Sequence, residues 1–474
     1  MTTSIVRKST FGSNQAFERL DAEYSEASSL ALEQALRKIA GEELRALAVP
    51  YSGPTLNGTF AEEDAPVEYI AIDSVDNQDG LTYSEELRYG DRPSRAKYVL
   101  KKSDLLVSNV RPNRNAVSLT SARGEGSLAS SGFTLVRLRD GSAFSAPLLF
   151  AYLKTEFAIT QLMRRDRGSM YPAVLSADVM DTWIPLPPKG LAGSIETSIE
   201  SASASHEKFF SLLGQAEAIL APFLEPLGSP PSPLETRKSS ADTTVVRSSD
   251  FFGADGAGRI DAEFFRSEYE DFDQNARELA DSFFLGEHYQ LAPGRGLGNG
   301  EEDTPLVKQA VLTNAGVNWS ALAFEEGVGR GSQSDVQPGD VILACTAHEI
   351  FYVGRKVDFV RDLPEQAVGN AAVADILRIR PIESDSPPVP GSYLAAFLRS
   401  AAGRHQVQRC IRGLRGGHVY KDDLSRYVRV PVPDKKLLRK FEESSSKAEE
   451  ERLLAKESTE AAVAKLSAWI RSAL

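Results

Sequence analysis

The chain of 474 residues has a formal net charge of −12, with 42% hydrophobic and 25% charged residues, which is ordinary for a globular protein. Its two cysteines, Cys345 and Cys410, both fall in the second half, so neither a disulfide scaffold nor a zinc site is expected. No apolar run approaches the ~18 residues of a membrane-spanning helix, and the first residues lack a signal-peptide core. We therefore expect a cytoplasmic protein.

Residues 1–187 are expected to form one domain of mixed structure. Brief apolar runs bounded by Gly, Pro, Asn and Asp predict strands at 69–72, 105–107 and 133–138. Apolar residues spaced for one face predict a helix over 145–164, with Ser145 as its cap. A cluster of prolines at 185–188 ends this domain, because proline cannot continue a strand ladder or enter the middle of a helix.

A long helix is predicted over 188–226. Its seam alternates spacings of four and three, as in a coiled coil: Ile195, Ile199, Ala202, His206, Phe209, Leu213, Ala216 and Leu220. We interpret His206 as a polar residue tolerated in this seam rather than as a functional histidine. A segment rich in Gly, Ser, Pro and Thr predicts a linker at 227–244.

The second half repeats the first. A second domain at 245–433 and a second long helix at 434–474 follow the same order, displaced by 236 to 246 positions. The matching segments include 19–24 (RLDAEY) with 259–264 (RIDAEF), 104–107 (DLLV) with 340–343 (DVIL), and 183–187 (WIPLP) with 429–433 (RVPVP). Two copies of one module suit a bipartite, pseudo-symmetric ligand.

These elements predict an α+β fold: two tandem, pseudo-symmetric α/β domains separated by long helices. Because each module is followed by one long helix, the two helices can pair with each other as an antiparallel coiled coil. Such a pair would hold the two modules at a fixed distance.

The charge distribution favours a polyanionic ligand in spite of the negative total. Residues 88–167 carry a net charge of +9 and residues 399–433 carry +6, whereas residues 261–303 carry −9. The two basic stretches occupy corresponding parts of the two halves. For binding nucleic acid, the local field at the contact surface matters more than the sum.

The motifs of several enzyme classes are absent from the sequence. There is no Gly-x-x-x-x-Gly-Lys-Ser/Thr loop for ATP and no Asp/Asn-Pro-Pro-Tyr/Phe tetrapeptide of adenine methyltransferases. The glycine runs at 294–300 and 327–331 lack the strand, lysine and helix of a phosphate loop, and the five histidines show no metal-ligand spacing. We therefore expect a chain that is not an enzyme and that binds neither a cofactor nor a metal.

The repeated entry motif, the Asp-hydrophobic strand, the hydrophobic-Pro exit and the long helix together resemble the specificity (S) subunit of type I restriction–modification systems. The resemblance covers essentially the whole chain. It implies two target-recognition domains, at 1–187 and 245–433, each contacting half of a split double-stranded DNA site. It also implies docking of methyltransferase (M) subunits, two in number, and of restriction (R) subunits. S-adenosylmethionine, ATP and Mg²⁺ are expected on those partners.

Within this resemblance, the candidate DNA-binding residues lie in loops that combine arginine, glycine and tyrosine. Arginine suits phosphate or guanine, and asparagine suits adenine. In the first half the candidates before the exit motif are Arg164, Arg165, Arg167, Ser169 and Tyr171. Their counterparts in the second half are Arg409, Arg412, Arg415, His418, Tyr420 and Lys421. A further group follows a strand of the first half: Asn109, Arg111, Asn113 and Arg114.

Two alternatives remain open at this level: a stand-alone DNA- or protein-binding scaffold of another defence system, and an enzyme with an unrecognised nuclease site. The acidic clusters at 62–64 and 301–303 recur in both halves, which indicates a structural role, with a metal or nuclease site there as the alternative. Steep salt dependence would distinguish DNA binding from protein docking.

Overall fold

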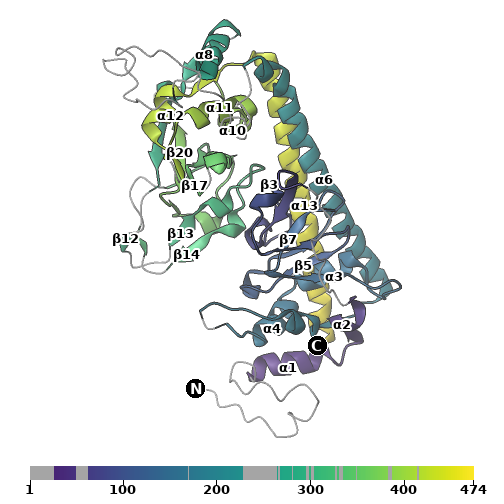
Figure 1. Cartoon of the computed structure of the whole chain (residues 1–474). Helices are drawn as coiled ribbons and strands as arrows, with labels where there is room; N and C mark the ends of the chain where they lie inside the picture. Colours follow the sequence, from purple (N-terminus) through teal and green to yellow (C-terminus); the bar gives the residue numbers. More distant parts are fainter. Residues whose placement is uncertain are drawn as a thin grey trace. The chain divides into compact units, whose positions relative to one another are not determined.

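The computed structural model describes residues 26–49, 62–168, 170–227, 264, 267–279, 281–294, 298–299, 304–325, 328–329, 335–348, 350–382, 387–413 and 416–474. The repeated segment 19–24 and most of its copy at 259–264, the linker after residue 227, Ser169 and Arg415 lie outside these residues. The chain divides into two compact units (Figure 1). Unit 1 is Met1–Phe209 with Glu449–Leu474, and unit 2 is Phe210–Ala448.

Unit 1 contains short strands and short helices. Its strands are β1 (Gly41–Glu43), β2 (Pro66–Ile70), β3 (Glu85–Arg88), β4 (Ala96–Val99), β5 (Leu105–Ser108), β6 (Val117–Leu119), β7 (Leu128–Ser130), β8 (Phe133–Val136) and β9 (Trp183–Pro185). Its short helices are α1 (Ala27–Leu36), α2 (Leu44–Leu47), α3 (Ala146–Leu153), α4 (Glu156–Arg164) and α5 (Ser176–Met180). The long helices α6 (Lys189–Leu224) and α13 (Lys435–Ala473) contribute to both units.

The strands of unit 1 form two main sheets. β5 lies between β6 and β8 and is antiparallel to both, and the second sheet has the order β3-β2-β7-β4 with β2 and β7 parallel. β1 pairs with β9 and so joins the start of the unit to its end. All four residues of β5 are buried, which explains why its sequence, LLVS, is not an apolar/polar alternation.

Unit 2 has corresponding elements. Its helices are α8 (Ser267–Leu279), α9 (Leu285–His288), α10 (Gly391–Arg399), α11 (Ala401–Arg409) and α12 (Lys421–Tyr427). Its strands are β10 (Ser282–Phe284), β11 (Tyr289–Pro293), β12 (Gly298–Asn299), β13 (Thr304–Val307), β14 (Ala323–Glu325), β15 (Val328–Gly329), β16 (Val341–Ala344), β17 (Thr346–Ala347), β18 (Val357–Phe359), β19 (Ala371–Ala372), β20 (Ile376–Pro381), β21 (Ile411–Arg412), β22 (Gly417–Val419) and β23 (Arg429–Pro431).

The sheets of unit 2 repeat the pairings of unit 1. β16 lies between β18 and β20, as β5 lies between β6 and β8. β13 pairs parallel with β19 and antiparallel with β14, as β2 pairs with β7 and β3. β10 pairs antiparallel with β23, as β1 pairs with β9. The predicted α+β fold with two repeated modules is therefore confirmed.

An ion pair inside each module follows the same repeat. In unit 1, Arg137 of the β8 end binds Asp104 through Nε and Nη2, at 2.6 and 2.5 Å. In unit 2, Arg380 binds Asp340 through the same two nitrogens, at 2.6 and 2.8 Å. Each aspartate is 1% exposed, and the arginine binds both of its oxygens, which offsets the cost of burying the pair.

The two long helices predicted from the sequence are present, and they pair within each unit. In unit 1, Lys465 of α13 donates to Ser194 of α6 at 2.6 Å, and Lys208 of α6 contacts Glu451 of α13. A later residue of α6 therefore contacts an earlier residue of α13. The helices are therefore antiparallel there. In unit 2, the Ser444 hydroxyl donates to the Leu212 carbonyl at 3.1 Å. Most of the predicted seam of α6 is buried, including Ile195, Ile199, Ala202, Phe209, Ala216 and Leu220.

Each module contacts the long helix that follows it through the same polar pair. Ser145, before α3, donates to Glu196 of α6 at 2.6 Å, and Ser392, at the start of α10, donates to Glu442 of α13 at 2.6 Å. Around these contacts the cores are apolar. In unit 1, buried residues of α3 and α4 pack with Ile195 and Ile199 of α6 and with Leu466 of α13.

The predicted helix over 145–164 is wrong in one respect, because the structure divides it into α3 and α4. Ser145 does cap α3, since its hydroxyl accepts from the Leu148 amide at 3.2 Å. The helix then breaks at Lys154, and Thr155 caps α4 by accepting from the Ala158 amide at 3.4 Å. The buried Lys154 amine donates to two loop carbonyls, which holds the break in place.

Candidate nucleic-acid interface

In unit 1 two loops lie side by side. The β5 loop (109–115) follows strand β5, and the α5 loop (166–175) precedes helix α5. The Arg111 amide donates to the Pro172 carbonyl at 2.7 Å, and the Val174 amide donates to the Asn109 carbonyl at 2.9 Å. These bonds join two groups of candidate residues that are about 60 positions apart in the sequence.

The side chains on these loops suit contacts with nucleic acid. Asn109 accepts from the Thr134 hydroxyl at 2.5 Å and donates to Ser176 at 3.4 Å, which orients its amide. Arg111 is exposed, and its guanidinium lies 5.7 Å from the centre of the Tyr171 ring. Tyr171 is 47% exposed and its neighbour Met170 is 92% exposed.

The β5 loop also concentrates positive charge. Asn113 is exposed and Arg114 is half-buried in the 3-10 turn η5 (Pro112–Arg114). Burial lowers the pKa of Arg114, and the nearby charge of Arg111 lowers it further. The positive charges of Arg111 and Arg114 together produce a local field that favours an anion.

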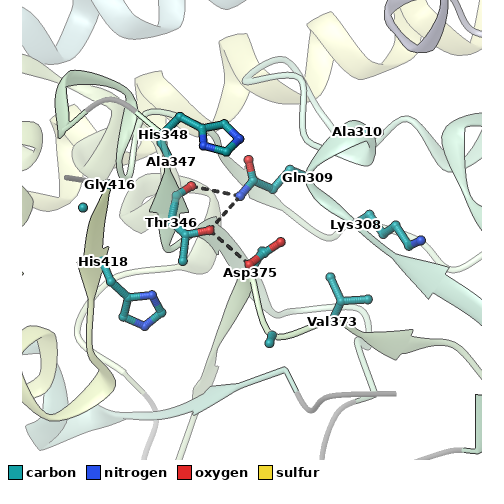
Figure 2. Close-up of a pocket in the computed structure, with 12 residues that line it drawn as sticks. Lys308, Gln309, Ala310, Thr346, Ala347, His348, Val373, Asp375, Gly416 and His418 are labelled. Carbon is teal, nitrogen blue, oxygen red and sulfur yellow. Dashed lines mark hydrogen bonds between the residues drawn. The ribbon is translucent and has the colours of Figure 1, made fainter. Parts of the chain in front are cut away.

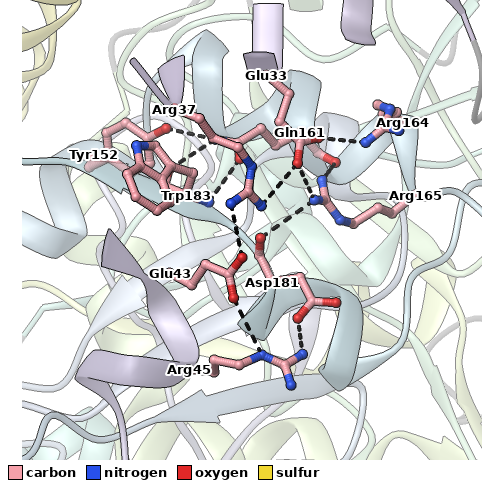
Figure 3. A network of polar contacts seen from close by, with 10 residues as sticks. All are labelled: Glu33, Arg37, Glu43, Arg45, Tyr152, Gln161, Arg164, Arg165, Asp181 and Trp183. Carbon is pink, nitrogen blue, oxygen red and sulfur yellow. Dashed lines mark hydrogen bonds and ion pairs between the residues drawn. The ribbon is translucent and has the colours of Figure 1, made fainter. Parts of the chain in front are cut away.

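Arg164 and Arg165 were predicted to contact DNA from an exposed loop, but in the structure they lie inside unit 1. Both side chains are buried, at 8% and 6% exposure, and both bind Glu33 of α1 (Figure 3). The distances are 2.6 Å from Arg164 Nη1 and 2.8 Å from Arg165 Nη2 to the two carboxylate oxygens. Arg165 also donates to the Gln161 carbonyl at 2.7 Å. These contacts join α1 to α4, so we leave both residues out of the interface.

Arg167 lies at the base of the α5 loop. Its Nε and Nη2 donate to the two oxygens of Asp178 at 2.8 and 2.7 Å. The Asp178 side chain is 7% exposed, whereas that of Arg167 is 37% exposed. Asp178 also accepts from the Leu175 amide at 2.9 Å, so it anchors both ends of the loop.

Unit 2 has the same pair of loops. The β16 loop (345–348) follows strand β16, and the α12 loop (411–420) precedes helix α12. Thr346 is paired with His418, and the Val419 amide donates to the Cys345 carbonyl at 2.9 Å. This bond corresponds to the one between Val174 and Asn109 in unit 1.

The candidate residues of the α12 loop fall into two groups. Tyr420 is 50% exposed and stacks near His418, with ring centres 4.4 Å apart, and the Arg412 guanidinium lies 5.8 Å from the Tyr420 ring. Lys421, beside them, is exposed and lies 3.3 Å from Asp422. Arg409 is instead 11% exposed and binds Asp273 at 2.9 Å, as Arg164 binds Glu33, so it too is left out.

A cleft of about 840 Å³ in unit 2 is lined by both loops and by two further segments, 308–310 and 373–375 (Figure 2). Gln309, of the 3-10 turn η8 (Gln309–Val311), donates to the Thr346 carbonyl at 2.9 Å, and the Thr346 hydroxyl donates to Asp375 at 3.1 Å. His418, the strand partner of Thr346, also lines the cleft. Gln309, Thr346 and Asp375 were not among the residues predicted from the sequence, because they lie outside the loops that combine arginine, glycine and tyrosine. Applying the displacement of the repeat to the β5 loop would have found the β16 loop.

Other kinds of site have little support in the described part of the chain. Among the described residues, no group of three or more His, Cys, Asp or Glu side chains is arranged to hold a metal ion. Over that same part, no helix combines the length and the apolarity that a membrane crossing needs. Of the acidic clusters considered as a nuclease site, 301–303 lies outside the described residues.

No protein-family model and no curated protein matches the chain. Solved structures match: an HsdS subunit from Thermoanaerobacter tengcongensis, at 16% identity, covers 92% of this chain and 97% of its own, with a TM-score of 0.33. A type I restriction–modification system S subunit from M. genitalium, at 11% identity, covers 92% and 96%, with a TM-score of 0.33.

A third match comes from a structural study of complex assembly and conformational transition in the type I R-M system. It has 18% identity, covers 92% of this chain and 97% of its own, and gives a TM-score of 0.31. The chain is similar to type I S subunits. This is the family that the sequence motifs resemble.

Proposed function

We propose that this chain is the specificity subunit of a type I restriction–modification complex, and that it recognises a bipartite site in double-stranded DNA. The observation that supports this proposal is the pair of loops built twice, once in each unit, by the same backbone bonds. In both units the loops carry an exposed arginine or lysine beside an exposed tyrosine. Two equivalent surfaces in one chain suit a ligand with two recognition elements.

The two loop pairs would contact DNA in three ways. Arg111, Arg114 and Lys421 supply charge for phosphate oxygens, which gives affinity and register without sequence preference. Asn109 in unit 1 carries an amide that can form two hydrogen bonds with the edge of adenine. Gln309 in unit 2 donates to Thr346 through its amide nitrogen, and its amide oxygen can accept from a base. Tyr171 and Tyr420 supply flat apolar surface for packing on sugars or bases. The specificity therefore comes from a small number of exposed side chains in each unit.

The long helices have a separate role in this proposal. Paired antiparallel, α6 and α13 set the spacing between the two half-sites and provide the surface on which two methyltransferase (M) subunits dock. Restriction (R) subunits join through them. This chain carries out no chemistry of its own in the complex, which acts in the cytoplasm, and S-adenosylmethionine, ATP and Mg²⁺ belong to the partner subunits.

The proposal is tested by deleting the gene in its native cells and mapping methylated adenines across the genome. One bipartite methylated motif should disappear, and a tagged copy of the chain should recover a methyltransferase at about two copies per chain. If every methylated motif persists and the chain is recovered without a methyltransferase, the proposal is overturned.

A second experiment assigns the units to the half-sites. Replacing Arg111 and Tyr171 by alanine should relax recognition of one half-site only, and replacing His418 and Tyr420 should relax the other. Binding of the wild-type complex should weaken steeply with salt, because phosphate contacts release counterions. Binding that is insensitive to salt would instead indicate a protein or carbohydrate ligand.

A further inference from the structure

In both units, an arginine of the loop forms a bidentate ion pair with an aspartate of the helix that follows the loop. Arg167 binds Asp178 and Arg412 binds Asp423, and in both pairs the partners are eleven positions apart. In unit 2 the distances from Nε and Nη2 are 2.6 and 2.7 Å. The same two nitrogens are used in both units.

Burial is also the same in the two pairs. The aspartates are 7% exposed in both units, whereas the arginines are 37% and 45% exposed. A carboxylate held inside the protein therefore fixes a guanidinium at the surface. The buried pairs of Arg164 with Glu33 and Arg409 with Asp273 differ in this respect, because there the arginine is inside as well.

This geometry has a consequence for recognition. A guanidinium is planar and has two edges that each present a pair of donors. When a carboxylate binds the Nε–Nη2 edge, the guanidinium can no longer rotate, and the Nη1–Nη2 edge is turned in another direction. A pair of donors on a fixed edge matches the O6 and N7 acceptors of guanine in the major groove. Arginine without such a partner would lose more rotational freedom on binding.

We infer that Asp178 and Asp423 are positioning residues that hold Arg167 and Arg412 for the recognition of guanine, one in each half-site. This inference rests on the proposed function. The interface then includes two acidic residues, Asp178 and Asp423, which do not contact DNA themselves. Each half-site is expected to contain at least one G·C pair.

The test uses the complex purified with its methyltransferase subunits and a duplex that carries the methylated motif. Replacing each guanine in turn by 7-deazaguanine removes the N7 acceptor and leaves the pairing intact. Bidentate contacts imply that, in the wild type, one such replacement in each half-site weakens binding about 10-fold or more. In the Asp178→Asn and Arg167→Lys variants, the loss of affinity caused by 7-deazaguanine should fall to about 2-fold in one half-site and stay unchanged in the other. Asp423→Asn should do the reverse.

Asp104→Asn is the matched control. Asp104 forms the same bidentate pair, with Arg137, but on the strands of the module rather than on the loops. It should leave every 7-deazaguanine penalty as in the wild type, even if the protein becomes less stable. Arg167→Lys keeps the charge and Asp178→Asn keeps an acceptor for the Leu175 amide, so one of the two variants can be measured if the other does not fold.

The outcomes separate this inference from the proposed function. If the wild-type complex has no specific bipartite site, the proposed function fails. If it has one, but a half-site contains only A·T pairs or the penalties do not depend on Arg167 and Asp178, the inference alone fails. If Arg167 instead contacts phosphate, Arg167→Ala should weaken binding to all sequences and lower the salt slope by about one, which also overturns the inference.

Discussion

Replacing Glu33 by glutamine tests whether Arg164 and Arg165 serve the fold or the DNA. Glu33 is 9% exposed at its side chain and lies within 2.8 Å of both guanidinium groups. The substitution keeps the shape of the side chain but removes the negative charge. Arg164 and Arg165 then each lose the carboxylate that neutralises them, although Arg165 still donates to the Gln161 carbonyl.

The expected cost is large. Removing one partner of a buried ion pair destabilises a protein by about 3–5 kcal/mol, because the remaining charge stays desolvated. Glu43 offers a control on the same face of unit 1. It lies 3.0 Å from Arg37 and 3.9 Å from Arg45, but its side chain is 33% exposed. Glu43→Gln should therefore cost about 0.5 kcal/mol or less.

The effect should also depend on pH in a defined direction. Burial alone would raise the pKa of Glu33, but the charges of Arg165 and Arg164 outweigh burial and lower it below the ordinary 4.5. A lowered pKa means that the carboxylate stabilises the folded state fully above pH 4.5 and loses this contribution as the pH falls through the folded-state value. The wild type and Glu33→Gln should differ most near pH 7 and converge in acid.

Urea titrations at several pH values, with hydrogen exchange of the amides in α1 and α4 as a local probe, measure this. A loss below about 1 kcal/mol, no larger than that of Glu43→Gln, would refute the structural role of the pair. So would a difference between variant and wild type that persists unchanged at low pH. Either result would make Arg164 and Arg165 candidate DNA contacts again.

Three further predictions concern unit 1 and its helices. Gly80 has a φ of +77°, and a Cβ there would lie 2.7 Å from the Phe150 ring, so Gly80→Ala should lower the free energy of unfolding by about 1–3 kcal/mol in urea titration. Burial, and then the charge of Asp79, raises the pKa of Asp76 to about 6, so its contribution to stability is lost as the pH rises from 3.8 to 6. Asp76→Asn should therefore be more stable than the wild type at pH 7 and equal to it near pH 3 in thermal unfolding. Inserting seven residues into α6 alone should abolish methylation of the native site, measured on plasmid DNA, whereas retained methylation would mean that the helices do not set the spacing.

The order of the domains and the long helices could be predicted from the sequence because they depend on periodicity and on repetition. Heptad spacing marks the buried side of α6, and the displacement of the repeat is enough to match β16 with β5. The break between α3 and α4 could not be predicted in this way. It depends on Lys154, whose amine reaches the carbonyls of Asn77 and Asn115, and no pattern within the helix reports on those partners.

The basic stretches were the least reliable guide to the site. Arg164 and Arg165 belong to the stretch 88–167, but the acid that neutralises them, Glu33, lies 131 and 132 positions away. Arg409 of the second stretch binds Asp273, 136 positions away in the acidic region. A count of charges along the sequence cannot see partners at such separations. Part of the local positive charge is therefore internal, and the surface is less basic than the sequence suggests.

The two units differ most where DNA would bind and least where charges are buried. The pairs of Arg137 with Asp104 and of Arg380 with Asp340 use the same atoms, because an unpaired buried charge costs several kcal/mol whatever the ligand. The exposed loop residues are not buried charges, so this cost does not restrict them. Arg111 and Tyr171 lie on the loops of unit 1, whereas His418 and Tyr420 lie on those of unit 2. A module of this kind can change the bases that it recognises without losing its fold, so exchanging exposed loop residues between the units should move specificity and leave stability nearly unchanged.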